Sequence, residues 1–261
     1  MSTYDLPSEV QVEIDGPIRI IRLNRPEELN ATNHALHEAI TETIALLDAD
    51  TEARVAVLTG NGRAFSAGGD FEYLEQQHYD VEARRASLVT GRRLVTSLVS
   101  LRIPLIAAVN GPAVGLGCSI VALSDVVFMA ESAHLADPHV AVGLVAADGG
   151  ALTWPLLTSL QLAKEYAFTG DRISARRAAE IGLANHVVPD DEVVDRAVEL
   201  AHRMAKLPRQ ALQDTKRILN LPLERAVMGA IDFALTAEER SFGSEELRAN
   251  VERLRSRSTK P

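Results

Sequence analysis

Hydrophobic and polar positions near the N-terminus follow the pattern of a β-hairpin. Residues 9–14 alternate between polar and apolar, Asp15-Gly16 supplies a turn, and residues 18–23 are mostly apolar. Two such segments joined by an Asp-Gly turn are typical of paired antiparallel strands. Short apolar runs follow further along the chain, and we expect each of them to form a buried strand. These runs cover residues 55–59, 105–109 and 125–130.

Helical spacing of apolar residues occurs between these strands and dominates the last third of the chain. Leucine and isoleucine residues three or four apart predict a helix over 33–48, with Thr32 or Asn33 as its N-cap. A further helix is expected over 81–101, and a run of small residues predicts another over 113–123. Later helices are expected at 156–167, 174–181, 190–206, 209–220 and 223–242, with Pro189, Pro208 and Pro222 between several of them.

This order of elements predicts an α/β fold. Parallel strands need a crossover connection, which is usually a helix, so alternating strands and helices favour a parallel sheet. We expect a core over residues 1–200 and a separate helical C-terminal region over residues 201–261. Residues 253–260 are basic, and we expect them to fray.

One uncharged segment is long enough to cross a bilayer. Residues 103–124 contain no formal charge, and about 20 apolar residues suffice for a transmembrane helix. The segment is interrupted by Pro104, Gly111, Pro112 and further small or polar residues, and lipid would leave its broken backbone without hydrogen-bond partners. We therefore expect a buried strand, a glycine turn and a buried helix rather than a membrane span.

The composition of the 261-residue chain narrows the function classes. Hydrophobic residues make up 46% of the chain, which supplies a sizeable core and excludes global disorder. The net charge of −9, from 27 basic and 36 acidic residues, argues against a nucleic-acid-binding protein. The chain has one cysteine, which excludes an intrachain disulfide, and residues 1–10 show no signal peptide, so we expect a cytoplasmic protein.

Two segments share the order strand, glycine-rich turn and helix. In the first, Val55–Gly60 precedes Ala64–Asp70, and in the second, Leu105–Val109 precedes Asn110–Cys118. Glycines at such turns let backbone N–H groups approach a ligand, and two N–H groups from different turns would form an oxyanion hole. The same glycines could instead serve only tight turns and close packing. Neither turn matches a phosphate-binding loop or a dinucleotide fingerprint, so we expect no nucleotide cofactor.

Ordered motifs along the chain resemble those of the crotonase (enoyl-CoA hydratase/isomerase) superfamily. They are residues 21–31, 64–70, 110–118, 169–171, 178–182 and 187–189. The resemblance covers nearly the whole chain. It implies a spiral of ββα units in the core, and a C-terminal helical region that assembles homotrimers or dimers of trimers.

The resemblance also implies a substrate and a binding site. The substrate would be an acyl-CoA thioester, so that coenzyme A is part of the substrate and no separate cofactor is expected. The thioester carbonyl would lie between the backbone N–H groups of Ala67 and Leu116. Coenzyme A would bind along Ala67, Gly68, Gly69 and Asp70, with Glu28 and Leu29 at its adenine end.

The chain departs from the family pattern at two positions. Hydratases of this family carry two glutamates, and the matching positions here are Ser119 and His139. Adding water across a double bond by the usual route needs one group to activate water and another to deliver a proton. Plain hydration by the usual glutamate pair is therefore not expected.

His139 and Asp148 are the candidate catalytic residues. Asp148 is the only formally charged residue between Asp137 and Lys164, and a buried carboxylate needs a partner or a role. Asp148 precedes two glycines and could alternatively cap the next helix. His139 could alternatively be a core histidine, but its position matches one that the family uses for acid–base chemistry.

The surroundings of these two residues resemble one member of the superfamily in particular. Residues 137–139, 143–145, 148–149 and 154–155 are similar to 6-oxocamphor hydrolase. That enzyme cleaves a C–C bond of a β-diketone by retro-Claisen chemistry, with a histidine and an aspartate at the matching positions. Of the other candidates, Glu238 in a C-terminal helix could approach the pocket. The remaining histidines show no metal-ligand spacing, so no metal is expected.

These observations leave three hypotheses for the function. The leading one is an enoyl-CoA hydratase/isomerase-type enzyme that stabilises the enolate of an acyl-CoA thioester, with His139 as acid–base group and Asp148 orienting it. The second is hydrolysis of a 1,3-dicarbonyl compound by the same two side chains. The third is a non-catalytic acyl-CoA-binding protein, which the loss of both glutamates favours and the presence of His139 and Asp148 opposes. We expect an oligomer, because the C-terminal helices carry more apolar residues than one layer can bury.

Overall fold

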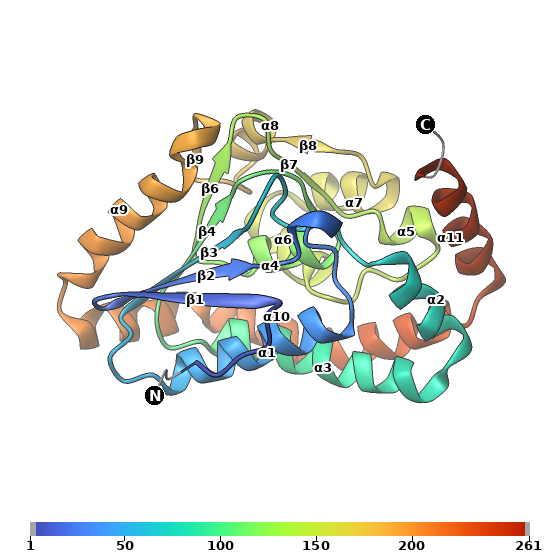
Figure 1. Cartoon of the computed structure of the whole chain (residues 1–261), viewed down its shortest axis with the longest axis horizontal. Coiled ribbons are helices and arrows are strands. Elements are labelled where there is room, and N and C mark those ends of the chain that lie inside the picture. Colours follow the sequence, from blue (N-terminus) through green and yellow to red (C-terminus); the bar gives the residue numbers. More distant parts are fainter. Residues whose placement is uncertain (1–3, 259–261) are drawn as a thin grey trace.

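The larger of two β-sheets forms the centre of the protein, whose computed structural model describes residues 4–258 (Figure 1). Its strands are β1 (Val10–Asp15), β2 (Ile18–Leu23), β3 (Val55–Gly60), β4 (Leu105–Val109), β6 (Val126–Ala130) and β9 (His186–Val188). They lie in the order β1-β2-β3-β4-β6-β9, with β1 antiparallel to β2 and all other neighbours parallel. The expected hairpin, the three expected buried strands and the parallel α/β core are confirmed.

A second, smaller sheet contains β5 (Ala113–Val114), β7 (His134–Ala136) and β8 (Ile173–Ser174). Twice, a strand of the large sheet is followed by a strand of the small sheet and then by a helix. These units are β4-β5-α4, where α4 covers Leu116–Ala122, and β6-β7-α5, where α5 covers His139–Val142. The repetition is the expected spiral of ββα units, and it explains why the helix expected over 113–123 begins as a strand.

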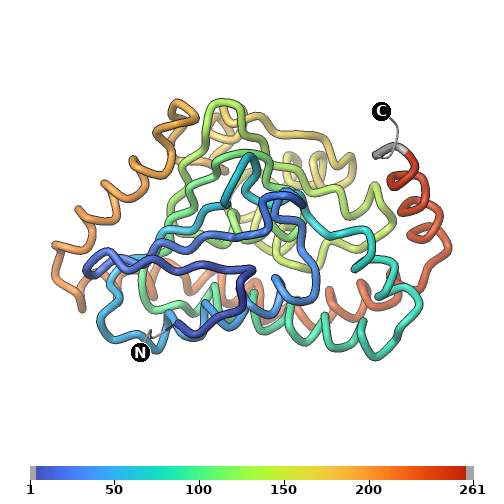
Figure 2. Tube along the Cα trace, viewed as in Figure 1, coloured from blue at the N-terminus to red at the C-terminus, as the bar shows by residue number. Residues whose placement is uncertain are grey.

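Four helices form layers around the large sheet. α9 (Val193–Ala205) packs against β3 and β4, and α1 (His34–Ala49), α3 (Val81–Ser100) and α10 (Arg209–Phe242) pack together. In Figures 1 and 2, α9 lies along the left side of the sheet and the other three run below it. α1 begins at an expected cap, because the Asn33 side chain accepts a hydrogen bond from the backbone N–H three residues later.

One expected helix is two helices in the structure. The prediction of a continuous helix over 156–167 is wrong, because α6 (Gly150–Leu157) ends before α7 (Leu160–Thr169) begins. The Ser159 side chain accepts a hydrogen bond from the Leu162 N–H at 3.2 Å and caps the new helix. Serine at this position satisfies an N–H group that the helix itself leaves free.

Conversely, two expected helices are one. The prediction of separate helices over 209–220 and 223–242 is wrong, because α10 continues through Pro222. Proline lacks an N–H group and deprives the carbonyl four residues earlier, that of Ile218, of its partner. Both residues are exposed, so water can hydrogen-bond to that carbonyl, and the packing of α10 on α3 holds the helix together.

Three further helices complete the fold. α8 (Ala175–Glu180) matches the helix expected over 174–181, whereas α2 (Phe71–Tyr79) was not expected. α11 (Glu245–Ser258) continues through most of the tail that was expected to fray, and the last two tail residues lie outside the described part. α2 and α11 pack against each other, and an ion pair of 2.9 Å between Glu75 and Arg255 joins them.

The C-terminal helices are continuous with the core. The expected boundary at residue 200 falls inside α9, and α10 joins the core through α3. Residues 103–124 form β4, β5 and α4 in the interior, as expected. Within residues 4–258, no helix is long and apolar enough to cross a membrane.

The two glycine turns interlock, and this positions the site. The Phe65 and Ser66 N–H groups both donate to the Pro112 carbonyl (3.1 and 3.0 Å), and the Val114 N–H donates to the Ser66 carbonyl (2.8 Å). At Gly117, a Cβ atom would lie only 2.7 Å from the Ser66 Cβ. Glycine at this position therefore lets α4 begin close to the first turn.

We expect Gly117→Ala to lower the free energy of unfolding by about 1–3 kcal/mol, the usual cost of forcing an extra methyl group into a packed site. Urea denaturation checks this, with Gly229→Ala as the matched control. Gly229 lies inside α10, where a Cβ atom would meet nothing within 4 Å, so alanine should stabilise the helix by roughly 0.5–1 kcal/mol. Wild-type stability of Gly117→Ala would contradict the interlocked turns.

Candidate active site

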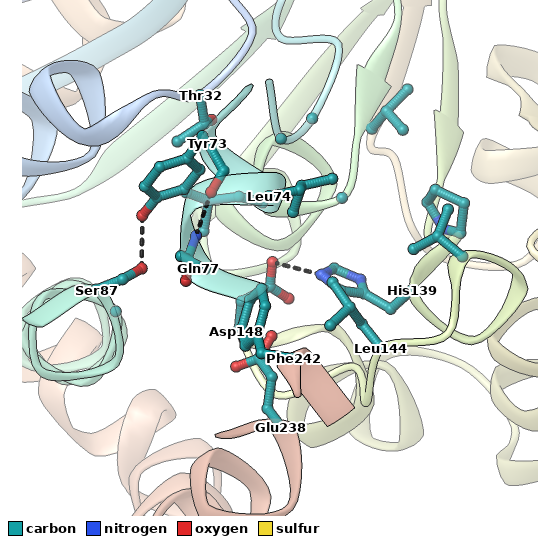
Figure 3. A pocket seen from close by; sticks show the side chains of 18 of the residues that line it. Thr32, Tyr73, Leu74, Gln77, Ser87, His139, Leu144, Asp148, Glu238 and Phe242 are labelled. Carbon is teal, nitrogen blue, oxygen red and sulfur yellow. Dashed lines mark hydrogen bonds and ion pairs between the residues drawn. The ribbon is translucent and has the colours of Figure 1, made fainter. Parts of the chain in front are cut away.

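A cavity of about 430 Å³ lies between the two glycine turns and helices α2, α3, α5, α10 and α11 (Figure 3). Its walls are mostly apolar and include Phe71, Leu74, Leu88, Val114, Val142, Leu144, Leu235 and Phe242. The polar side chains among them are Thr32, His37, Tyr73, Gln77, Ser87, His139, Asp148, Glu238 and, on α11, the exposed Arg253. An apolar cavity with a few convergent polar groups is the usual form of a small-molecule site.

Two backbone amides in the glycine turns can hold a carbonyl oxygen. Gly69 lies in the first turn, and Leu116 is the first residue of α4. Both line the cavity, and neither N–H group has a hydrogen-bond partner within residues 4–258. The turns meet here, because a Cβ atom on Gly115 would lie 3.6 Å from the Cα of Gly68. One cavity thus receives an N–H group from each turn, as an oxyanion hole requires.

The expectation that Ala67 supplies one of these N–H groups is wrong. Ala67 lines the cavity, but its N–H donates to the Leu29 carbonyl at 3.0 Å. That bond joins the first turn to the segment after β2 and uses the hydrogen that a substrate would need. The amide available in this turn is that of Gly69, two residues further on.

The remaining residues expected to bind coenzyme A divide into two groups. Gly68 lines the cavity beside Gly69. Glu28, Leu29 and Asp70 do not line it, because Glu28 is exposed and Asp70 caps α2 and pairs with Arg25 at 3.5 Å. Their role in binding a substrate stays a prediction.

His139 lies between two carboxylates at the start of α5. Its Nδ1 atom bonds to Asp137 Oδ1, and its Nε2 atom lies 3.3 Å from Asp148 Oδ2 (Figure 3). The side chains are nearly enclosed, with 12% of His139, 13% of Asp148 and 1% of Asp137 exposed. The structure therefore brings the two predicted residues into contact at the same cavity. It adds Asp137, for which the sequence suggested no role.

Asp148 does not cap the following helix. α6 begins after Gly149 without a side-chain cap, and Asp148 Oδ1 instead accepts a hydrogen bond from Ser119 Oγ at 2.7 Å. Ser119 Oγ in turn accepts from the Gly150 N–H at 3.2 Å, so its hydroxyl group is engaged on both sides. Ser119, at one of the two expected glutamate positions, is 1% exposed and does not line the cavity. It holds Asp148 in place.

The attraction between His139 and the carboxyl groups of Asp137 and Asp148, which we call the triad, sets the protonation states of His139 and Asp148. Burial by itself lowers the pKa of His139, but the charges and hydrogen bonds of Asp148 and Asp137 raise it well above its ordinary value. Burial would raise the pKa of Asp148, yet His139 and the hydrogen bond from Ser119 hold it below its ordinary value. At neutral pH His139 is therefore an imidazolium beside an ionised Asp148. Asp148 can accept a proton, and His139 can donate one.

Three further titratable side chains line the cavity and are neutral near pH 7, namely Glu238, His37 and Tyr73. Burial, reinforced by Asp148 and Asp137 and opposed by His139, raises the pKa of Glu238 to about 8. Burial also lowers the pKa of His37 to about 4, against a smaller effect of Asp148. Glu238 was a candidate from its place in a C-terminal helix, and it does reach the pocket. His37 was missed, because only its position in the fold distinguishes it from the other histidines.

Asp137, His139 and Asp148 also have the spacing of a metal site, because one ligand atom from each lies within 4.8 Å of the others. Both ring nitrogens of His139 are, however, bonded to carboxylates on opposite edges of the ring. A metal ion would have to replace one of these bonds. Because the imidazolium already balances much of the carboxylate charge, we interpret the cluster as a hydrogen-bonded triad.

Known proteins share both the fold and the length of this chain. A family model described as enoyl-CoA hydratase/isomerase matches residues 13–257. The short-chain-enoyl-CoA hydratase of Clostridium acetobutylicum is 31% identical over 237 residues, which cover 90% of this chain and 88% of the relative. The solved structure of an enoyl-CoA hydratase/isomerase from Mycobacterium paratuberculosis is 56% identical, with a TM-score of 0.94 over 96% of this chain and 100% of that chain.

A third similar protein is described by a different activity. The structure of a β-diketone hydrolase from the cyanobacterium Anabaena, bound to (S)-3-oxocyclohexyl acetic acid, is 26% identical to this chain. Its TM-score is 0.86 over 93% of this chain and 97% of that chain.

The raised pKa of Glu238 makes stability depend on pH. Between the ordinary value of 4.5 and the folded value of about 8, the folded state keeps a proton that the unfolded state releases. This group therefore lowers stability as pH rises through that window. We expect Glu238→Gln to remove this loss of stability. Its free energy of unfolding should exceed that of the wild type by on the order of a few kcal/mol at pH 8.5, and by little at pH 5. Thermal melts at both pH values check this, and a pH-independent difference would mean that Glu238 titrates normally.

Proposed function

The chain belongs to the enoyl-CoA hydratase/isomerase family, and from this premise we propose that it hydrolyses a carbon–carbon bond of a 1,3-dicarbonyl compound. The observation that carries the proposal is one proton-transfer unit, Asp137–His139–Asp148, in place of two separate glutamates. Hydrolytic cleavage needs a group that takes a proton from water and later returns it to carbon. One unit can perform both steps in succession.

In the proposed reaction, one carbonyl oxygen of the substrate accepts hydrogen bonds from the Gly69 and Leu116 N–H groups. Water attacks the carbon of the second carbonyl and gives a proton to Asp148. The bond between that carbon and the carbon shared by the two carbonyls then breaks, and its electron pair forms the enolate. The two amides stabilise this enolate, because they point at the oxygen where negative charge develops.

The proton returns to the enolate carbon through the same unit. His139 carries a proton next to Asp148, so it can donate to carbon while Asp148 passes its own proton back to the ring. One water molecule is consumed, the attacked carbonyl becomes a carboxylic acid, and the enolate becomes a ketone. The triad ends in the protonation state in which it began.

The size and polarity of the cavity support a compact substrate. Its volume of about 430 Å³ and its mostly apolar walls suit a cyclic diketone with few polar groups. The Anabaena neighbour supports the same reaction class, because it is a β-diketone hydrolase. Its bound compound is a keto acid, the kind of product that such a reaction yields.

Enolate chemistry on an acyl-CoA thioester is the second candidate. The Gly69 and Leu116 amides and the similarity to a short-chain-enoyl-CoA hydratase favour it. Coenzyme A would then extend past Gly68 towards Asp70, Leu29 and Glu28. Ser119 weighs against hydration, because its hydroxyl group is engaged and lies outside the cavity. A non-catalytic binding protein is the weakest candidate, since burying three charged groups is costly without a use for them.

We expect the purified protein to convert bicyclo[2.2.2]octane-2,6-dione to (3-oxocyclohexyl)acetic acid. His139→Ala and Asp148→Asn should each lower kcat/KM by at least about a hundredfold, the usual effect of removing a positioned acid or base. The double variant should be little worse than the worse single variant, because the two groups act as one unit. Mass spectrometry in oxygen-18-labelled water checks the chemistry, since one labelled atom should enter the new carboxylate.

Crotonyl-CoA serves as the competing substrate in the same assay. Hydration of crotonyl-CoA without cleavage of the diketone would overturn the proposal in favour of acyl-CoA chemistry. Thermal melts of each variant control for folding. Wild-type turnover by Asp148→Asn would remove Asp148 from the mechanism.

We also propose that the C-terminal helices join copies of this chain. On α10, Ile218, Leu219 and Phe233 are 65%, 71% and 77% exposed, whereas Ile231 and Phe242 are buried within the chain. Exposed apolar side chains gathered on one helix favour burial against another protein surface. A symmetric homotrimer or dimer of trimers would provide that surface.

Light scattering at micromolar concentration should therefore report the mass of a trimer or hexamer. Phe233→Glu should lower this mass, because the charge would have to be buried at the contact. Phe168→Glu is the matched control, since Phe168 lies on α7 and is similarly exposed (66%). A monomeric wild type would contradict the proposal.

A further inference from the structure

Glu238 is a buried acid that the mechanism above does not use. It lies on α10, is 6% exposed and lines the cavity. Figure 3 shows it at the same cavity as Asp148, and the charge of Asp148 acts on its pKa. Among the residues that the structure describes, none forms a hydrogen bond or an ion pair with its carboxyl group. A buried polar group without a partner is costly, so a ligand is the natural partner here.

The surroundings keep this carboxyl group protonated. Burial is the main cause, the charges of Asp148 and Asp137 reinforce it, and His139, which is shared between those two carboxyl groups, opposes it. From α1 and α2, His37 and Tyr73 face the same cavity as neutral groups. A neutral carboxylic acid has an O–H group, and it can therefore donate a hydrogen bond where a carboxylate cannot.

In the proposed reaction, the negative charge on the oxygen of the attacked carbonyl has no hydrogen-bond donor assigned to it. Attack of water on the second carbonyl places negative charge on that carbonyl's oxygen, before the enolate forms at the first. The amides of Gly69 and Leu116 hold only the first oxygen. An oxyanion in a mostly apolar cavity needs its own hydrogen-bond donor, and losing such a donor typically costs about 100-fold to 1,000-fold in kcat.

We propose that the Glu238 carboxylic acid donates the hydrogen bond that stabilises the oxygen of the attacked carbonyl. This inference rests on the proposed function, because only a dicarbonyl substrate has the second oxygen. Glu238 keeps its proton throughout. The oxygen becomes an alkoxide when water adds and returns to a carbonyl when the carbon–carbon bond breaks, so the acid is neither consumed nor charged.

The same arrangement selects the substrate class. The group held by Glu238 must be a neutral ketone oxygen, because a carboxylate would be repelled by Asp148, which lines the same cavity. The site therefore favours 1,3-diketones over 3-oxo acids. After cleavage the attacked carbonyl has become a carboxylic acid, and once this acid gives its proton to water, repulsion by Asp148 favours release of the product.

The test compares Glu238→Gln with Glu238→Leu on bicyclo[2.2.2]octane-2,6-dione. Glutamine keeps an N–H donor, whereas leucine keeps only the volume. We expect Glu238→Leu to lower kcat by about 100-fold or more, and Glu238→Gln to lower it by about tenfold or less. The wild type should lose activity as pH rises through about 8, and this loss should be weaker in Glu238→Gln. Glu239→Gln is the matched control, because Glu239 is the neighbouring residue and pairs with Arg85 at the surface.

Three results would overturn the inference while leaving the proposed function intact. Equal, large losses of kcat in both variants would make Glu238 a proton donor rather than a hydrogen-bond donor. Wild-type kcat in Glu238→Leu would show that the acid is not used. Equal pH profiles of the wild type and Glu238→Gln would exclude its titration. Absence of diketone cleavage by the wild type would instead overturn the proposed function itself.

Discussion

The centre of the site is one imidazole ring held between two buried carboxylates. Removing charged groups from water is costly, and their attraction offsets that cost only when each partner is held in good geometry. The fold supplies this support. Asp137 is buried just after β7, His139 opens α5, and the Ser119 hydroxyl fixes Asp148 from α4. Ser119 and the triad thus form one hydrogen-bonded assembly, in which Ser119, at an expected glutamate position, donates to Asp148.

Burial and the charges of this assembly together set the protonation states of its neighbours. Burial, reinforced by Asp148 and Asp137 and opposed by His139, raises the pKa of Glu238 to about 8, so this acid keeps its proton at neutral pH. His37 stays neutral because burial outweighs the pull of Asp148. The cavity therefore presents neutral donors beside one ionised triad, and it suits an uncharged substrate better than a charged one.

The sequence predicted the parts of the site that follow from motifs and spacing. The two strand–glycine-turn–helix segments follow from local patterns, whereas the ββα spiral and the importance of His139 follow from the family resemblance. The structure agrees with these predictions and places His139 in contact with Asp148. Local patterns could not show which backbone N–H group in the first turn is available to a substrate. The choice between Ala67 and Gly69 depends on the hydrogen bond from the Ala67 N–H to the Leu29 carbonyl, which forms only in the folded chain. His37 is brought to the cavity by the packing of α1, which no local pattern encodes. Pro222 signals a helix end, yet packing on α3 carries α10 through it.

The number of proton-transfer units limits the chemistry that this site can perform. Hydration by the usual route uses two groups at once, one on water and one on carbon. Here Ser119 stands at one of the two glutamate positions, and its hydroxyl group is already hydrogen-bonded to Asp148 and to the Gly150 N–H. At the other position stands His139, whose triad can hold a proton and release it later. A reaction that separates water activation from carbon protonation fits such a site. Retro-Claisen cleavage does so, because the carbon–carbon bond must break before the carbon can accept the proton. The family's pair of amides is then retained for the step common to both reactions, the stabilisation of an enolate.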